Sequence, residues 1–342
     1  MVEHKADQKQ GGFIFYFSKL QNEPNLPTEF VWPEEDLAHP NPEELDAPLI
    51  DLDGLVRGDE KAIIIAAEQV RRACLNHGFF QIINHGVDTS LIQAAQQEMD
   101  AVFKLPLDKK LSISQKPSSL AEGVIFFLYS HDKSSEEAEV VNYFKSILGQ
   151  DYVSLGRVYQ KFCEEMKKVS EMIFELLAIS LGLEDHLHYK KYFEDGKSLM
   201  RVNSYPSCKN AEMALGTGPH LGGFEVFYNN KWQSVRPRPD AFVIHIGDTF
   251  VALSNGKYKS CMHRAVVNTG KERQVFFVSP KEDKVVRPPQ DLVCGEDQQR
   301  KYPDFTWSDM MQYTQKHHRV DGDALKCFVD YHIMSSKLPL SN

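Results

Sequence analysis

The sequence has few of the features that mark a disulfide-bonded or membrane-spanning protein. Six of its 342 residues are cysteine, and none of them belongs to a CxxC pair. Cysteines scattered in this way fit reduced structural thiols better than a disulfide framework or a zinc site. No uninterrupted apolar run reaches membrane-spanning length, and residues 1–12 are charged and polar rather than a signal peptide. We therefore expect a cytoplasmic protein that makes no membrane contact.

The chain also has fewer basic than acidic residues. The chain carries 39 Lys and Arg against 48 Asp and Glu, which gives a formal net charge of −9 at pH 7. Because phosphate groups are bound by clustered Lys and Arg, this balance argues against a nucleic-acid partner. A hydrophobic content of 42% with 25% charged residues is typical of a globular protein. The length allows one large domain, or one core with a smaller appended part, and we expect a monomer.

The first half of the chain alternates between strand and helix patterns. Residues 1–46 are rich in Gln, Pro, Asn and Glu and are expected to be irregular. Apolar residues then recur at helical spacing in some segments and form short runs bounded by Gly, Pro or Asn in others. The predicted strands are 48–52 and 79–83, and the predicted helices are 59–76, 90–103 and 155–181.

Beyond Gly196 the pattern changes to short strands of period two. Turn signals lie at Asn229-Asn230 and Asn255-Gly256, and this spacing predicts an antiparallel barrel or jelly roll. The tail, 305–334, returns to helix. The fold class is therefore mixed α/β, with a double-stranded β-helix core flanked by helices. The predicted regions are an irregular segment 1–46, an αβ region 47–150, a helical support 151–195, a jelly-roll domain 196–295 and a helical tail 296–342.

Two histidines and an arginine in the strand-rich region suggest a metal site beside an anion pocket. His220 and His263 each adjoin a predicted strand, and Arg273 follows ten residues after His263. Non-haem Fe(II) oxygenases hold iron with two His and one carboxylate, and an Arg can pair with the carboxylate of a 2-oxoacid. With 13 histidines in the chain, a surface or core role remains the alternative for any one of them. The expected carboxylate two positions after His220 is absent, because Gly222 stands there.

Longer motifs resemble the plant 2-oxoglutarate- and Fe(II)-dependent dioxygenases, and within that family the gibberellin 20-oxidases. The resemblance extends from Phe30 to Leu338. It rests on FVWP (30–33), HGFFQIINHGV (77–87), VVNYFKSILGQDY (140–152), YFEDGKSLMRVNSYPSC (192–208), RPRPDAFVIHIGDTFVALSNGKYKSCMHRAVVN (236–268) and SPKEDKVVRPP (279–289).

The resemblance implies a distorted jelly roll and assigns roles to individual residues. His220 and His263 match the iron-binding histidines. Tyr205 and Arg273 match residues that bind 2-oxoglutarate, and Asn203 matches a position near this cosubstrate. The implied reaction is oxidation of a gibberellin precursor at C-20 with Fe(II), 2-oxoglutarate and O₂, supported by ascorbate.

The chain departs from the family pattern at three places. His220 opens no H-x-D motif, Arg273 opens no R-x-S motif, and a substrate-recognition segment is missing between Ser119 and Phe127. These gaps predict a jelly roll that lacks one core strand, as in a truncated splice form or gene model. The third iron ligand would come from water, from the cosubstrate or from Glu225. The alternative is a catalytically impaired or inactive protein that acts at most by binding.

For four other polar residues a structural role is the simpler interpretation. His245 lies on an apolar strand and fits a hydrogen-bonded core histidine better than a cavity residue. Asp248 fits a turn cap. His77 and His85 flank a strand and fit turn or capping positions.

Overall fold

The structure is a computed structural model of the 342-residue chain. It describes residues 43–113, 124–131, 138–204, 215–216, 224–266, 272–294, 299–317 and 324–337. The expected irregular segment is therefore described only from residue 43. There, β1 (Glu44–Leu45) pairs in parallel with β8 (Lys231–Val235), so the end of that segment is ordered against the strand-rich half.

The N-terminal part joins strand and helix as predicted. β2 (Leu49–Asp51) pairs in parallel with β3 (Phe79–Ile83), and α2 (Asp53–Arg57) and α3 (Glu60–Asn76) lie between them. The Asp59 carboxylate caps α3 by accepting the backbone N–H groups of Lys61 and Ala62, which have no partner within the helix. β9 (Phe242–His245) pairs antiparallel with β3 and completes this sheet. The first and last thirds of the chain thus share one sheet.

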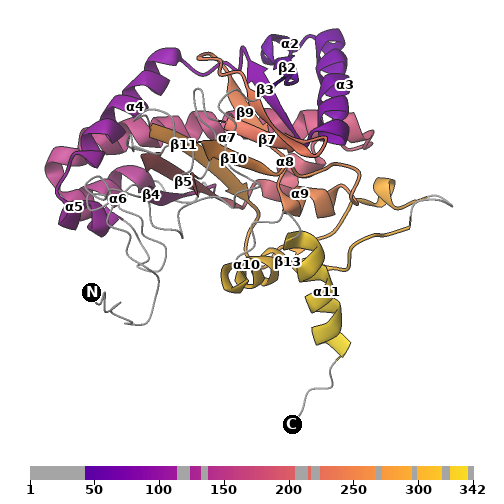
Figure 1. Ribbon diagram of the computed structural model, residues 1–342. Coiled ribbons are helices and arrows are strands. Elements are labelled where there is room, and N and C mark those ends of the chain that lie inside the picture. The colour runs from indigo at the N-terminus through magenta and orange to yellow at the C-terminus, as the bar shows by residue number, and fades with distance from the viewer. Residues whose placement is uncertain are drawn as a thin grey trace.

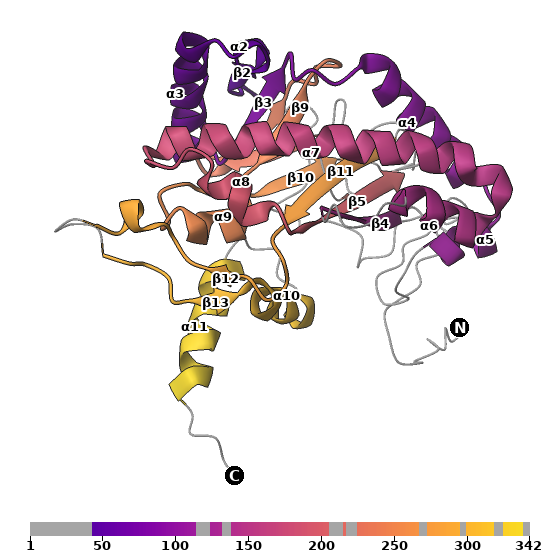
Figure 2. The same ribbon diagram turned by 180° about the vertical axis from the view of Figure 1, so that it is seen from behind.

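One long helix supports the strands. α7 (Val153–Leu181) confirms the predicted helix, and Gly182 ends it at φ 73°. Figures 1 and 2 show α7 running along one face of the strands, with other helices beside it. The helices that pack against α7 are α3, α4 (Thr89–Phe103), α6 (Glu139–Leu148) and α8 (His188–Phe193), whereas α5 (Leu107–Ile113) packs against α6. A 3₁₀ turn η4 (Gln150–Tyr152) precedes α7. α6 approaches α7 closely, because a Cβ atom at Gly156 would lie 2.7 Å from the Val141 Cα.

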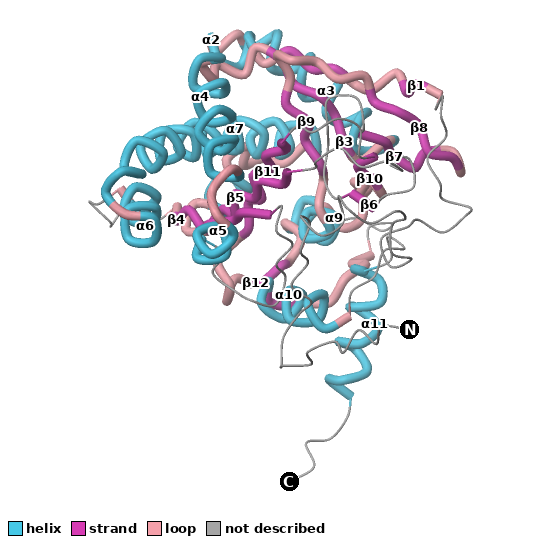
Figure 3. Tube along the Cα trace, turned by 60° about the vertical axis from the view of Figure 1, so that its left-hand side comes forward, coloured by secondary structure: helices cyan, strands magenta, loops and turns pink. Residues whose placement is uncertain are grey.

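The strand-rich half contains two larger sheets. A three-stranded sheet has β5 (Lys197–Ser204) between β4 (Val124–Ser130) and β11 (Glu272–Ser279). A five-stranded sheet has the order β1-β8-β7-β10-β6, with β6 (Leu215–Gly216), β7 (Phe224–Tyr228) and β10 (His263–Val266). Figure 3 separates the two groups of strands in space. The predicted turn between β7 and β8 is present, with Asn229 and Asn230 at φ 52° and 60°, as a tight hairpin requires.

A short helix interrupts this half where a turn was predicted. α9 (Asp248–Leu253) follows β9, and Phe250, Ala252 and Leu253 are buried on it. The main hydrophobic core accepts these three side chains, which explains why an apolar segment of strand-like composition forms a helix here.

The C-terminal part is helical, as predicted. β12 (Val285–Val286) pairs with β13 (Phe305–Thr306), and a 3₁₀ turn η6 (Gln290–Leu292) lies between them. α10 (Trp307–Lys316) begins with a capping box of Thr306 and Asp309, and α11 (Ala324–Lys337) follows. Among the helices in the described ranges, none combines the length and apolar character needed to cross a membrane.

The mixed α/β class is confirmed, whereas the jelly roll stays a prediction. The described strands form sheets of five, three, three and two strands. The predicted loss of a core strand concerns the chain just after His220, and residues 217–223 lie outside the described part.

Candidate functional site around His263

His263 begins β10 and lies among aromatic side chains. It is opposite Val226 on β7, so both side chains project from the same face of the sheet, as does Phe224 two residues before Val226. The His263 ring lies 5.8 Å from the Phe224 ring and stacks on His245 at 4.2 Å between ring centroids, with an interplanar angle of 25°. His263 is nevertheless exposed. One side of the imidazole therefore packs on rings while the residue remains accessible.

A backbone hydrogen bond fixes the orientation of this imidazole. The His263 Nδ1 atom lies 2.9 Å from the Cys261 carbonyl oxygen. A carbonyl oxygen accepts hydrogen bonds and cannot donate them, so Nδ1 carries the proton, and a neutral ring then has its lone pair on Nε2. Metal-binding histidines are oriented by this kind of second hydrogen bond. His263 is thus arranged as an Nε2 ligand.

Two further donor side chains join His263. The ligand atoms of His245, Cys261 and His263 all lie within 4.8 Å of one another. Burial raises the pKa of the Cys261 thiol to about 12, so the sulfur is protonated at neutral pH, and it contacts the Met262 carbonyl oxygen at 3.5 Å. His245 packs against Phe79 and Phe224. We refer to His245, Cys261 and His263 as the His-Cys-His cluster.

Glu225 does not belong to this cluster, which corrects the expectation that it could supply the third iron ligand. It is opposite Arg264 in the β7–β10 register, so its side chain projects from the other face of the sheet from His263. The Glu225 Oε2 atom accepts from Arg264 Nε at 2.7 Å and lies 2.7 Å from Nη2. The Arg264 guanidinium also covers the Trp232 ring at 4.1 Å from its centroid. The glutamate is therefore the counterion of a buried arginine.

The predicted 2-oxoglutarate residues are placed only in part. Asn203 lies on β5 with 2% of its surface exposed, and its Oδ1 accepts from Arg201 Nε at 2.9 Å. In the backbone register Asn203 is opposite Arg273 of β11. Tyr205 and His220 lie outside the described residues, as does the Arg273 side chain. The structure therefore brings the backbones of Asn203 and Arg273 together, and the roles of Asn203, Arg273, Tyr205 and His220 stay predictions.

The remaining candidates have structural partners. His85 is 6% exposed, its Nδ1 accepts from the Val87 N–H at 3.2 Å, and its ring stacks on Phe242. This fits the predicted turn position. Asp248 begins α9, and burial raises the pKa of its carboxyl while a hydrogen bond from Ser260 opposes the rise.

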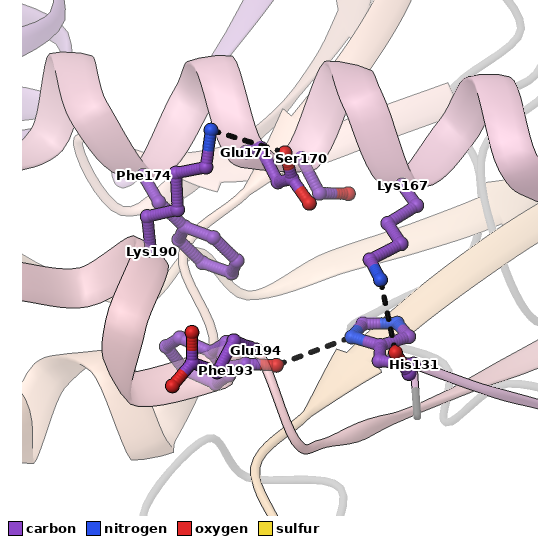
Figure 4. A pocket seen from close by; sticks show the side chains of 8 residues that line it. All are labelled: His131, Lys167, Ser170, Glu171, Phe174, Lys190, Phe193 and Glu194. Atoms are coloured by element: carbon purple, nitrogen blue, oxygen red, sulfur yellow. Dashed lines mark hydrogen bonds and ion pairs between the residues drawn. The ribbon is translucent and has the colours of Figure 1, made fainter. Parts of the chain in front are cut away.

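A recess beside α7 contains none of the predicted site residues. Figure 4 shows its lining, which consists of His131, Lys167, Ser170, Glu171, Phe174, Lys190, Phe193 and Glu194. Lys190 pairs with Glu171 at 3.2 Å, Lys167 donates to the His131 carbonyl oxygen at 3.0 Å, and His131 Nδ1 donates to the Phe193 carbonyl oxygen at 3.1 Å. These charged groups already bind one another or the backbone, so the recess serves packing between α7 and α8.

The described residues fit a two-histidine, one-carboxylate iron site only in part. His263 has the accessible imidazole and the orientation that such a site needs. The second predicted histidine is outside the described ranges. Within those ranges the donors that converge on His263 are an imidazole and a thiol, and no carboxylate joins them. The described residues therefore do not supply the third ligand of an iron site.

Sequence reasoning missed Cys261. Its wide separation from other cysteines suggested a structural thiol, and no CxxC pair marked it. The available signal was its position two residues before His263, because the alternation of a strand would place both side chains on one face.

Comparison with known proteins gives two matching family models. Residues 47–146 match the N-terminal region of non-haem dioxygenases in morphine synthesis, and residues 196–279 match the 2OG-Fe(II) oxygenase superfamily. Gibberellin 20 oxidase 5 of Arabidopsis thaliana is 41% identical over 352 residues, covering 94% of this chain and 90% of that protein. Gibberellin 20 oxidase 2 of Oryza sativa is 43% identical over 340 residues, covering 90% and 86%.

Solved structures share the fold. A crystal structure of JOX2 in complex with 2OG, Fe and JA superposes with a TM-score of 0.74 at 26% identity, covering 92% of this chain and 98% of that one. The rice dioxygenase for auxin oxidation superposes with a TM-score of 0.65 at 23% identity, covering 82% and 98%.

Proposed function

Because the chain belongs to the 2-oxoglutarate- and Fe(II)-dependent oxygenase family, we propose that it oxidises a gibberellin precursor at C-20 in gibberellin biosynthesis. The observation that supports this substrate is the identity of about two residues in five to gibberellin 20-oxidases over nine-tenths of the chain.

In this proposal His220 and His263 hold the iron, and Tyr205, Arg273 and Asn203 bind 2-oxoglutarate. When bound, iron and 2-oxoglutarate supply the O₂-dependent oxidation chemistry, with ascorbate as a supporting reductant. The residues of this chain position the reactants. The Cys261 carbonyl oxygen keeps the proton on His263 Nδ1, so Nε2 is the ligand atom. Phe224 and His245 shield one side of the His263 ring from water. The third protein ligand is replaced by water or by the cosubstrate.

A second candidate is a binding protein with little or no turnover. Two observations favour it. Gly222 stands where the family carries a ligand carboxylate, and Glu225 is bound to Arg264 on the opposite face of the sheet. Loss of one anionic ligand lowers affinity for Fe(II), because less of the ion's charge is neutralised.

Anaerobic titration with Fe(II) and 2-oxoglutarate tests the proposal. The enzyme candidate predicts a metal-to-ligand charge-transfer band that is lost in His220→Ala and in His263→Ala. It also predicts succinate formation that depends on a C-20 gibberellin precursor. A folded protein that gives no band at saturating iron would contradict the enzyme candidate and leave the binding protein. His186→Ala, an exposed position outside the site, is the control.

A further inference from the structure

We propose that the His-Cys-His cluster is itself a metal site, selective for Zn²⁺-class ions over Fe(II), with His245, Cys261 and His263 as its protein ligands. The inference goes beyond the proposed oxidation and does not need gibberellin or 2-oxoglutarate to bind. It rests on the geometry of three donors: His245 on β9 of one sheet, His263 on β10 of another, and Cys261 in the segment that leads into β10.

The donor set matches one metal class. Two imidazoles and one thiolate are soft or borderline ligands, which suit Zn²⁺ and copper, whereas Fe(II) oxygenase sites use a carboxylate as the third ligand. Three protein ligands with a fourth position open to water are also the usual arrangement of a reactive zinc site. His263 is exposed, so the fourth position can reach solvent.

The spacing is close to what such a site requires. Zinc bonds of about 2.0–2.1 Å to nitrogen and about 2.3 Å to sulfur place tetrahedral donors about 3.3–3.6 Å apart. The three ligand atoms here lie within 4.8 Å of one another, so they have to move closer by at most about 1–1.5 Å to reach that separation. The stacked His245 and His263 rings must tilt apart, since both nitrogens have to point at one ion.

The surroundings strengthen binding. Cys261 packs on a small apolar cluster formed by Leu45, Phe79, Phe224, Val226 and Val235. Electrostatic attraction between Zn²⁺ and a thiolate is stronger beside such an apolar cluster than in bulk solvent. The His263 Nδ1–H bond to the Cys261 carbonyl oxygen orients the imidazole from behind.

Metal binding has to remove the thiol proton. The Cys261 S–H bond breaks, the sulfur lone pair forms the bond to the metal, and the proton passes to solvent. Metal ligands have to be deprotonated, so a thiol that binds the ion as thiolate releases one proton per ion.

The site shares His263 with the proposed iron site. One imidazole nitrogen binds one ion, so Zn²⁺ in the cluster excludes Fe(II) from the pair His220 and His263. Zinc loaded first is expected to reduce the Fe(II)–2-oxoglutarate charge-transfer band in proportion to its occupancy.

Titration of the metal-free full-length protein with Co²⁺, as a coloured substitute for Zn²⁺, tests the site. We expect a near-ultraviolet thiolate-to-cobalt band that saturates at one ion per chain, with release of one proton. Cys261→Ser is expected to abolish the band and to weaken Zn²⁺ binding by more than about 100-fold, because even partners of metal ligands change affinity by about 10–100-fold. His245→Asn is expected to weaken binding while leaving a residual thiolate band.

The controls separate this site from the iron site. Cys294→Ser removes an exposed free thiol and should leave the cobalt band intact. His220→Ala should remove the Fe(II)–2-oxoglutarate band and keep the cobalt–thiolate band, so either proposal can fail alone. Circular dichroism checks that each variant is folded. A cobalt–thiolate band that survives Cys261→Ser, disappears in His220→Ala, or never forms in the folded wild type would overturn the proposal.

Discussion

Replacing Glu225 by Gln removes the charge that neutralises the most deeply buried arginine of the described chain. The Arg264 and Glu225 side chains are 1% and 5% exposed, and two guanidinium nitrogens lie 2.7 Å from the same carboxylate oxygen. The variant keeps the shape of the side chain but leaves a buried cation against a neutral amide and the Trp232 ring. Breaking a buried pair in this way destabilises a protein by about 3–5 kcal/mol, because the remaining charge keeps its desolvation penalty.

Urea and thermal unfolding measure this loss. Trp232, one of three tryptophans, reports the unfolding of this sheet by fluorescence. At about 2 °C per kcal/mol for a chain of this size, the midpoint should fall by roughly 6–10 °C. Glu282→Gln is the matched control, because Glu282 is 68% exposed and its nitrogen–oxygen distance to Lys197 is 3.7 Å, so no measurable change is expected.

A double variant separates charge from packing. Glu225→Leu combined with Arg264→Met removes both charges, and stability should return to within about 1–2 kcal/mol of the wild type. The Fe(II)–2-oxoglutarate band should be unaffected by Glu225→Gln, since this glutamate faces away from His263. A Glu225→Gln loss below about 1 kcal/mol, or one equal to that of Glu282→Gln, would refute the reasoning about the buried pair.

Two further predictions concern the scaffold. Burial lowers the pKa of the His131 imidazole, whose Nε2 accepts from the Ser198 hydroxyl at 2.6 Å. In the unfolded chain the same imidazole is protonated with a pKa near 6.5. The free energy of unfolding should therefore stay constant above pH 6.5 and fall as the pH drops below it. The urea midpoints measured at pH 7.5 and pH 5.5 should differ less in His131→Gln than in the wild type. His186→Gln, at an exposed position, should leave that difference unchanged. Gly156→Ala should destabilise the chain by about 1–3 kcal/mol, because the added methyl group meets the α6 backbone 2.7 Å away. Gly247→Ala, with nothing within 4 Å of its Cβ position, should cost clearly less in the same thermal unfolding assay, and equal losses would contradict the close α6–α7 approach.

Local sequence signals were enough to predict most of the long elements. α3 and α7 carry apolar residues at helical spacing, and a glycine of positive φ follows within two residues of each helix end, Gly78 after α3 and Gly182 after α7. The paired asparagines at 229–230 specified the β7–β8 turn. These features depend on neighbouring residues alone, so one sequence contains the necessary information.

Pairings between distant strands could not be predicted in the same way. β9 joins β3, more than 150 residues earlier in the chain, and β1 joins β8. Nothing near His245 indicates that its ring will stack on His263, because that contact depends on how two sheets pack. Glu225 looked available because it is close in sequence to His220, and only the register of β7 with β10 shows that its partner is Arg264.

The alternation of side chains along β10 has a consequence for folding accuracy. His263 and Arg264 are adjacent, and they face opposite sides of the sheet, toward the aromatic rings and toward Glu225. A slip of one residue would exchange them, placing a guanidinium among the aromatic rings and leaving Glu225 without its counterion. Such a mispaired sheet would be far less stable than the native one. The Glu225–Arg264 pair thus favours the native alignment of β7 with β10, and it keeps the His263 imidazole on the face of the sheet that carries Phe224.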